Sequence, residues 1–325
     1  MIISKTPLRM SFAGGGSDFK GYYQKGYGSV VSTAIDKYIY VTINKKFDDL
    51  IRVSYSKTEM VGDIEKIEHN LIRESLKLTG VTKGIDLSYM SDMLPAKEGT
   101  GLGASSTLLI GILNALYTHK GQRVSTDRLA SEACKIEIDI LGSPIGKQDQ
   151  YAAAFGNFNF IKFNPDESVL VEPVLCEPET KDKLNKNLLL FYTGTGSISK
   201  NILTEQKKKI NVNFNLLDKM VKLSENLRDV LTNNDLKEFG NILHQNWLYK
   251  QKLASKITNN LINGYYEKAR QAGAIGGKIL GSGGGGFLLL YCQEENQNKV
   301  RQALSNLKET PFGFEPEGSK IVYVD

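Results

Sequence analysis

Glycine gathers at three points of this 325-residue chain, and each point follows a segment with the pattern of a β-strand. The clusters are Gly14–Gly16, Gly99–Gly103 and Gly281–Gly286. Glycine loses more backbone freedom on folding than any other residue, so repeated glycines persist where the backbone needs a positive φ or approaches something closely. Each cluster is therefore predicted to be a tight loop with a specific task.

The second cluster has the pattern of an anion-binding loop. It leads into the small, apolar segment Ala104–Tyr117, which is predicted to be a buried helix. The first N–H groups of a helix have no partner within it, and they lie at the positive end of its dipole. We therefore expect the loop to bind phosphate, with hydroxyl groups from Ser105 and Ser106 on the phosphate or on Mg²⁺. The alternative is a simple glycine turn capped by a serine.

Two common nucleotide-binding motifs are excluded. A Walker A loop requires GxxxxGK[ST], whereas Gly273–Ile279 is one residue short and lacks the hydroxyl residue. The third cluster matches GxGxxG, but a dinucleotide fold needs a helix next, and Phe287–Tyr291 is predicted to be a strand. The HRD and DFG motifs of protein kinases are also missing from the sequence.

Composition excludes further classes of protein. No segment has the roughly 18 consecutive apolar residues of a membrane span, and the N-terminus lacks a signal-peptide pattern, so we expect a cytoplasmic protein. The three cysteines and three histidines are scattered, which argues against a zinc, redox or His-based site. The net charge is only +5, and Lys207–Lys209 is predicted to be a solvated helix face. Neither a nucleic-acid nor a membrane partner is expected.

The order of predicted elements indicates an α+β chain with two domains. The first part is predicted to contain strands at Ile2–Phe12, Ser29–Ala34, Tyr38–Ile43, Ile51–Tyr55, Ile85–Tyr89, Phe158–Phe163 and Val169–Val174, and helices at Ile64–Leu78, Ala104–Tyr117 and Thr126–Leu141. The polar segment Cys176–Lys186 lacks apolar periodicity and is predicted to be a linker between domains at residues 1–180 and 187–325.

The second part is predicted to run β, helices, β, β, α, β. The predicted elements are strands at Asn187–Tyr192, Ile275–Leu280, Phe287–Tyr291 and Lys320–Val324, with a helix at Glu294–Leu307 before the last strand. This order fits a ferredoxin-like layer of helices on an antiparallel sheet.

Three ordered motifs carry a family resemblance. They are Pro7–Asp18, with its Arg9 and glycine run; Pro95–Ser106, which matches PxxxGLGSS except for Ala104 in place of the first serine; and the glycine-rich Lys278–Gly286. Together they resemble the motifs of the GHMP kinases, the superfamily of galactokinase, homoserine kinase, mevalonate kinase and phosphomevalonate kinase. The resemblance spans nearly the whole chain.

This resemblance implies the two-domain GHMP kinase fold, with an N-terminal domain like the second domain of ribosomal protein S5 and a ferredoxin-like C-terminal domain. It also implies ATP as phosphoryl donor, with Mg²⁺, in a site between the domains. The expected ATP-phosphate contacts are Gly99, Gly101, Leu102, Gly103, Ala104, Ser105 and Ser106.

The family's Mg²⁺ ligands are a hydroxyl group of the phosphate loop and a distant carboxylate. Motif position makes the hydroxyl residue Ser105. For the carboxylate, one predicted helix offers Glu132, Glu137 and Asp139, and helical spacing does not choose, because Glu132 and Glu137 flank the apolar face about equally. The resemblance favours Glu137, which precedes Gly146–Gln150 at the spacing of galactokinase-like members.

The acceptor side of the site is implied in the same way. Asp149 matches the aspartate taken as general base in galactokinase and mevalonate kinase, and Arg9 matches the family's arginine at the transferred group; the alternative for Asp149 is a helix cap. The alternative for Ser17 and Asp18 is that they cap a turn and do not contact the acceptor. The expected acceptor contacts are Arg9, Gly15, Gly16, Ser17, Asp18, Lys147, Thr193, Gly194, Gly283 and Gly284.

Within the superfamily, Thr6–Phe19, Gly146–Gly156 and Phe191–Ser197 most resemble D-glycero-α-D-manno-heptose 7-phosphate kinases and their fucokinase-like relatives. The resemblance to the heptose 7-phosphate kinases implies phosphorylation of the anomeric hydroxyl of a heptose that already carries a distal phosphate, for nucleotide-sugar synthesis. A distal phosphate would need a cation, and Lys20, Lys147 and Lys200 are candidates. The alternatives are a kinase of unphosphorylated fucose or galactose, and a non-catalytic regulator that binds sugar and ATP. We expect a monomer or a homodimer.

Overall fold

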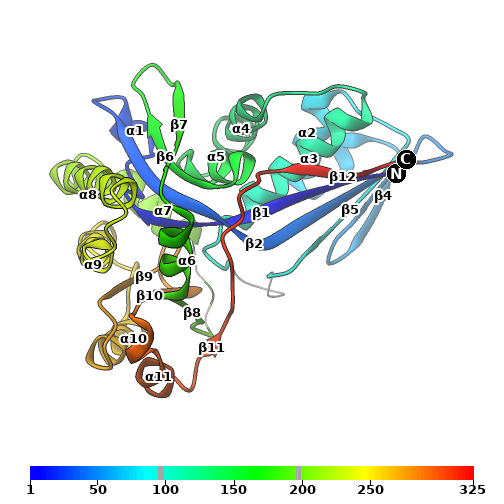
Figure 1. Cartoon of the computed structure of the whole chain (residues 1–325). Coiled ribbons are helices and arrows are strands. Elements are labelled where there is room, and N and C mark those ends of the chain that lie inside the picture. Colours follow the sequence, from blue (N-terminus) through cyan, green and yellow to red (C-terminus); the bar gives the residue numbers. More distant parts are fainter. Residues whose placement is uncertain (94–98, 195, 197–198) are drawn as a thin grey trace.

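The larger of two sheets is built on β1 (Ile2–Ala13) and β2 (Gly28–Lys45), two long antiparallel strands (Figure 1). The computed structural model describes residues 1–93, 99–194, 196 and 199–325. β2 is one strand where the sequence pattern predicted two. The polar interruption at Asp36 and Lys37 lies where β2 changes its second partner from β6 to β5.

The remaining strands of this sheet extend it on both sides. They are β3 (Ile51–Ser54), β4 (Thr58–Val61), β5 (Ile85–Ser91), β6 (Phe158–Phe163), β7 (Val169–Pro173) and β12 (Lys320–Val324). The order is β12-β1-β2-β5-β3-β4, while β6 pairs with β2 and β7 with β6. β3 and β5 run parallel, and the other pairs described run antiparallel.

Most helices of this part gather around α3 on one region of the sheet (Figure 1). The elements are the short α1 (Lys20–Tyr23), a 3₁₀ turn (Ile64–Lys66), α2 (Asn70–Thr79), α3 (Ala104–His119), α4 (Thr126–Cys134), a π-helical turn (Lys135–Ile140) and α5 (Gln148–Phe155). Most residues of α3 from Ser106 to Tyr117 are buried, as its all-round apolar sequence predicts. The helix expected at Thr126–Leu141 is present, but its last part is π-helical.

The segment predicted to be an unstructured linker contains a helix, α6 (Pro178–Lys186). Pro178 begins the helix, where a missing N–H is tolerated. Its buried residues are Thr180 and Leu184, one helical turn apart. Two inward positions in nine residues are too few to produce a recognisable apolar period, which explains why the sequence pattern missed this helix.

The second sheet is antiparallel, in the order β11-β8-β10-β9. Its strands are β8 (Leu188–Tyr192), β9 (Gly276–Ile279), β10 (Phe287–Tyr291) and β11 (Lys308–Glu309), and the helices of this part are α7 (Ser199–Lys208), α8 (Phe214–Thr232), α9 (Phe239–Lys250), α10 (Asn260–Gln271) and α11 (Glu294–Ala303). Helices and sheet therefore combine as predicted for an α+β protein.

The last strand was assigned to the wrong sheet. The sequence pattern placed Lys320–Val324 at the end of the second sheet, but β12 pairs with β1, and the short β11 supplies the fourth strand. The two chain ends consequently lie together, with Asp325 N donating to Met1 O at 3.0 Å (Figure 1). A strand pattern reveals pleat and burial, but it carries no information about which distant edge will pair.

One apolar cluster of the core spans the two parts. Phe12 of β1 and Phe239 of α9 meet edge to face at 5.4 Å, and both belong to a cluster that includes Tyr291 of β10. Ser29 and Ser224 add a buried hydrogen bond of 2.7 Å between β2 and α8. Among the residues described, no helix combines the length and apolar character needed to cross a bilayer.

Candidate active site

Two of the three glycine clusters pack against each other, backbone on backbone. Gly101 has a φ of +79°, and a Cβ there would lie 2.5 Å from Leu280 O. A Cβ on Gly281 would lie 2.4 Å from Gly101 Cα. No side chain fits at this contact, so the loop before α3 and the turn between β9 and β10 meet only because both carry glycine there.

The loop before α3 presents the uncapped N-terminus of a long helix. Gly103 is the N-cap residue, has a φ of +75° and supplies no side-chain cap, so the N–H groups of the first turn remain available to an anion. Leu102 is fully buried, and its carbonyl accepts a hydrogen bond from Arg9 N at 3.1 Å. Leu102 thus anchors the loop, whereas Gly99 is exposed. Pro95, the predicted start of this motif, lies outside the described residues.

Glu137 lies beside the two serines of α3. Ser105 Oγ and Ser106 Oγ donate to its two carboxylate oxygens, each at 2.6 Å, and Gln150 Nε2 donates at 2.5 Å. Burial raises the pKa of Glu137, against these three hydrogen bonds. By contrast, Glu132 accepts hydrogen bonds from Tyr117 and Arg128. The π-helical turn brings Glu137, and not Glu132, to the serine hydroxyls.

These groups form an oxygen-donor set rather than a complete metal cage. In the described part of the chain, no group of three or more His, Cys, Asp or Glu side chains could hold an ion. Mg²⁺ is commonly bound through one or two carboxylates together with the phosphates of a nucleotide. The carboxylate of Glu137 and the hydroxyl of Ser105, next to the phosphate loop, fit that pattern.

Arg9 links the phosphate loop to Asp149. Its Nε and Nη2 donate to the two carboxylate oxygens of Asp149 at 2.7 and 2.6 Å, and its Nη1 donates to Gly101 O at 2.7 Å. The Arg9 side chain is only 3% exposed, while that of Asp149 is 25% exposed. A bidentate pair of this kind fixes both the position and the orientation of the carboxylate.

Asp18 lies on the same cavity as Arg9 and Asp149 and is fixed by backbone hydrogen bonds. It is 2% exposed, and its carboxylate accepts hydrogen bonds from Gly16 N at 2.9 Å and Gln148 N at 3.3 Å. Burial, with a smaller contribution from Asp149, raises the pKa of Asp18. Gly146 allows this approach, since a Cβ there would lie 2.0 Å from an oxygen of Asp18.

A narrow cavity of about 70 Å³ joins these side chains. It is lined by Arg9, Gly15, Gly16, Asp18, Phe19, Ile145, Gly146, Gln148, Asp149, Leu203, Gln206, Lys250, Gly281 and Ser282. Five predicted residues therefore come together, from β1, the first glycine cluster and α5. The volume suits about two water molecules, given roughly 30 Å³ for each, so a sugar would need the space beyond it.

Other predicted acceptor residues lie elsewhere. Ser17 is buried and donates to Gly14 O and Ser29 O, which makes it part of the turn. Thr193 N and Oγ1 both donate to Gly286 O, and Gly194 is exposed. Gly283 and Gly284 pack against the segment around Ile257. Thr195 and Ser197, part of the same predicted motif, lie outside the described residues.

A second cavity, of about 690 Å³, adjoins the narrow one and shares Asp18, Phe19 and Ile145 with it. Five lysines line it, against three carboxylates. The lysines are Lys20, Lys135, Lys147, Lys207 and Lys208, and the carboxylates are Asp18, Asp139 and Glu167. Two members of the basic run that was predicted to be only a solvated face therefore border this cavity, together with the candidates Lys20 and Lys147. Lys200 is not among its lining residues.

Glu167 neutralises part of that charge. It accepts hydrogen bonds from Lys147 Nζ at 2.5 Å and Tyr23 OH at 2.7 Å, and it pairs with Lys20 Nζ at 2.9 Å. Burial opposes ionisation, but these donors lower the pKa of Glu167 to about 2. Glu167 also has a φ of +72°, which a non-glycine residue rarely adopts.

Several lining residues were not among the predicted site residues, and two of them, Gln148 and Lys250, carry polar groups into the site. Gln148 Oε1 is buried and has no hydrogen-bond partner among the residues described. Lys250 is 6% exposed and closes α9. A signal was present for Lys250, because it follows Leu243 and Trp247 at helical spacing on the buried face of α9, where a lysine is unexpected.

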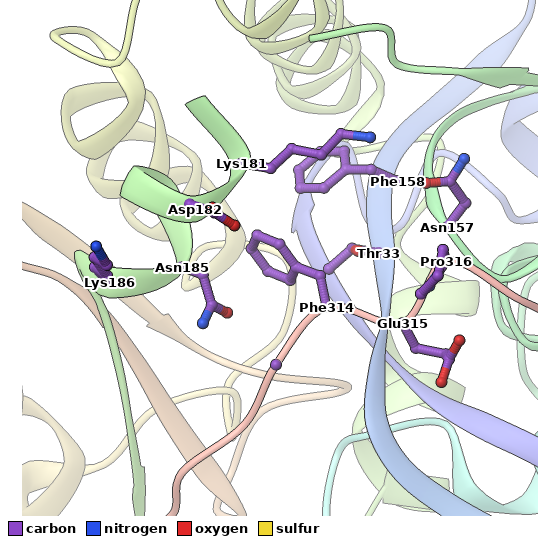
Figure 2. A pocket seen from close by; sticks show the side chains of 11 residues that line it. Thr33, Asn157, Phe158, Lys181, Asp182, Asn185, Lys186, Phe314, Glu315 and Pro316 are labelled. Atoms are coloured by element: carbon purple, nitrogen blue, oxygen red, sulfur yellow. The ribbon is translucent and has the colours of Figure 1, made fainter. Parts of the chain in front are cut away.

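A separate cavity of about 570 Å³ lies between α6 and the segment that precedes β12 (Figure 2). Figure 2 shows Phe158 and Phe314 on it, with Asn157, Lys181 and Glu315 nearby. It contains no part of the phosphate loop and none of the groups around Asp149. It is therefore not the candidate active site.

Comparison with known proteins identifies the family of the chain. The family models described as the GHMP kinases N-terminal domain and the GHMP kinases C terminal match residues 64–157 and 223–309. D-glycero-alpha-D-manno-heptose 7-phosphate kinase of Campylobacter jejuni is 29% identical, over 98% of both chains. Galactokinase of Pyrococcus furiosus is 24% identical, over 93% of this chain and 92% of its own.

The solved structures agree. The crystal structure of a D-glycero-D-manno-heptose 1-phosphate kinase from Bacteroides thetaiotaomicron superposes with a TM-score of 0.83, at 26% identity and over 100% of both chains. The two family models fall on the two halves of the fold described above, and they include α3, Glu137 and Asp149. The chain therefore belongs to the GHMP kinases and is an ATP-dependent kinase with their two-domain fold.

Proposed function

We propose that the chain transfers the γ-phosphoryl group of ATP to the anomeric hydroxyl of D-glycero-α-D-manno-heptose 7-phosphate, which yields the 1,7-bisphosphate. The observation that carries the proposal is the Arg9–Asp149 pair, which joins a partly exposed carboxylate to the loop before α3. A group that accepts a proton and a site that binds phosphate then lie on either side of one guanidinium.

The chemistry needs positioning, charge neutralisation and removal of one proton. The N–H groups from Gly101 to Ser106 hold the ATP phosphates. Asp149 accepts the hydroxyl proton as the new phosphorus–oxygen bond forms, a contribution of about 10²–10⁴ in rate. Arg9 keeps the carboxylate oriented, and its positive charge would neutralise charge on the group in transfer.

Ser105 and Glu137 are the residues that would hold Mg²⁺. When bound, the ion would neutralise charge on the ATP phosphates. The buried Glu137 carboxylate already lies within hydrogen-bond reach of both serines, so little rearrangement of the chain is required. We place the boundary between the two domains at α6, with residues 1–180 carrying most ATP and acceptor contacts and β12 returning to the first sheet.

The choice of a phosphorylated sugar rests on the second cavity. The narrow cavity has too little room for a sugar, so an acceptor held at Asp149 must extend past Asp18 into the lysine-lined space. A phosphate at the far end of a heptose would then meet Lys147, Lys207 or Lys208. The Campylobacter relative, which is named for the 7-phosphate, supports this choice.

The similar proteins differ in the phosphate that their names give. One is named for heptose 7-phosphate and the superposed structure for heptose 1-phosphate. A kinase of an unphosphorylated sugar is the second candidate, and one observation favours it. Glu167 already satisfies Lys20 and Lys147, so the cavity does not need a phosphate to balance these two lysines.

The test is a panel of acceptors with ATP and Mg²⁺, read by ADP release and product mass. The panel contains heptose 7-phosphate, heptose 1-phosphate, free heptose, L-fucose and galactose. We expect heptose 7-phosphate to exceed free heptose in kcat/KM by at least about tenfold, because charge-assisted hydrogen bonds contribute about 1.5–3 kcal/mol each. Equal values would favour the unphosphorylated sugar. Binding without ADP release for any acceptor would indicate a non-catalytic regulator.

A further inference from the structure

Two buried lysines lie where the glycine clusters meet, Lys250 at the end of α9 and Lys278 in β9. Lys278 is 1% exposed, and its ammonium donates to Ser11 O at 2.7 Å and Phe12 O at 3.2 Å. These two bonds tie β9 to the end of β1. Lys278 therefore has a structural task that accounts for most of its donors.

Lys250 is different. Its Nζ donates to Gly281 O, and no other acceptor for it is found among the residues described. An ammonium group carries three donors, and a buried charge is costly unless its donors are satisfied. Lys250 also lines the narrow cavity together with Arg9 and Asp149. A buried cation with unused donors beside a cavity indicates an oxygen-rich, anionic ligand.

The bond to Gly281 locates that ligand. Gly281 packs against Gly101 of the phosphate loop, and Gly101 O accepts a hydrogen bond from Arg9. Lys250 and Arg9 thus reach the same glycine contact from α9 and β1. Phosphate bound at α3 and a hydroxyl bound at Asp149 would both approach this point, so it is where a phosphoryl group passes from donor to acceptor.

We propose that Lys250 is a catalytic residue whose ammonium donates to the oxygens of the phosphoryl group in transfer. The inference rests on the kinase activity but not on the identity of the sugar. In the step, the bond between the γ-phosphorus and the β–γ bridging oxygen breaks. The bond from the acceptor oxygen to phosphorus forms, and the hydroxyl proton goes to Asp149. Lys250 gains and loses no proton; it neutralises charge on the moving group.

The electrostatics of the cavity suit this task. Burial, followed by the charge of Arg9, lowers the pKa of Lys250 to about 8, against the opposing effect of Asp18 and Asp149. Lys278 also faces it, and burial lowers the pKa of Lys278 as well. In the free enzyme Lys250 is charged below its pKa. Its contribution to catalysis is therefore present below about pH 8 and is lost as the pH rises through that value.

The experiment compares Lys250→Met and Lys250→Arg with Lys252→Met, an exposed lysine two residues further on. The acceptor is whichever sugar in the panel the wild-type protein phosphorylates. We expect Lys250→Met to lower kcat by about 10²–10³, the usual effect of losing one donor to a developing charge. The KM for the sugar and the dissociation constant of ATP should change little, and Lys252→Met should resemble the wild type.

The pH profile distinguishes a catalytic role of Lys250 from a purely structural hydrogen bond to Gly281. In the wild type, kcat/KM should fall above about pH 8. We expect Lys250→Arg to retain part of the activity and to lose this alkaline decrease, because arginine stays charged. The inference is wrong if Lys250→Met keeps wild-type kcat. It is also wrong if Lys250→Met loses activity only together with thermal stability while Lys250→Arg keeps the wild-type alkaline decrease. Absence of wild-type turnover with every sugar would overturn the proposed function itself.

Discussion

Arg9 and Asp149 lie 140 positions apart in the chain, yet their side chains form a bidentate pair with hydrogen bonds of 2.7 and 2.6 Å. The same guanidinium donates to Gly101 O. One side chain of β1 therefore sets the distance between the carboxylate on α5 and the loop before α3. The predictions below test the parts of this arrangement separately.

Asp149→Asn keeps the shape of the side chain but removes its capacity to accept a proton. We expect turnover to fall by about 10²–10⁴, while the affinity for ATP stays nearly unchanged, because Asp149 contacts Arg9 and not the loop amides. ADP release and calorimetric ATP titration measure the two effects. Asp127→Asn, at an exposed position of α4, is the control. Turnover above about a tenth of the wild-type value would remove Asp149 from the role of base.

Glu137→Gln should raise the Mg²⁺ concentration needed for half-maximal activity, and Ser105→Ala should act in the same direction. The carboxylate of Glu137 is bonded to Ser105, whereas that of Glu132 is occupied by Tyr117 and Arg128. Glu132→Gln is therefore the matched control on the same helical segment. Calorimetric titration of ATP with and without Mg²⁺ gives a second readout that is independent of turnover. A magnesium defect in Glu132→Gln alone would show that the wrong glutamate has been chosen.

The double variant Lys207→Met/Lys208→Met should raise the KM for heptose 7-phosphate by roughly tenfold, since about 1.4 kcal/mol of lost contact corresponds to that factor. The KM for free heptose should not change, because that sugar has no group for these lysines. Lys209→Met is the control: Lys209 belongs to the same basic run but pairs with Glu205 and does not line the cavity. An equal rise in KM for both sugars would mean that the substitutions disturb α7 and do not remove a contact with the distal phosphate.

Gly101→Ala should destabilise the fold and abolish ATP binding. The added Cβ would lie 2.5 Å from Leu280 O, so the contact between two glycine clusters must open. Gly121→Ala is a matched control, with a φ of +68° but nothing within 4 Å of the added atom. The control should lose only the roughly 1 kcal/mol of backbone strain in free energy of unfolding. Denaturant titration measures both variants, and equal losses would contradict the close packing of Gly101 and Gly281.

Much of the fold could be predicted because its signals are local. The buried helix after Gly103 and the strands around it follow from apolar periods that a reader can recognise in the sequence. The partners of these elements are not local information. β12 joins β1 across the full length of the chain, and α6 buries only two side chains, so neither was predicted correctly.

The sequence by itself was enough to recognise the family and the phosphate loop, because motif order and helix-start chemistry are written in consecutive residues, and the resemblance then named Arg9, Ser105 and Asp149 as candidates. Helical spacing left Glu137 and Glu132 open, and the resemblance favoured Glu137; the tertiary structure then added the contact of Glu137 with Ser105 and Ser106, through a π-helical turn that a regular helical period does not anticipate. The tertiary structure also shows that Lys250 lines the narrow cavity, whereas Gly283 and Gly284 are not among its lining residues. The physical reason is that burial and hydrogen bonding depend on which distant backbones meet, and here they meet at two glycines 180 positions apart, Gly101 and Gly281.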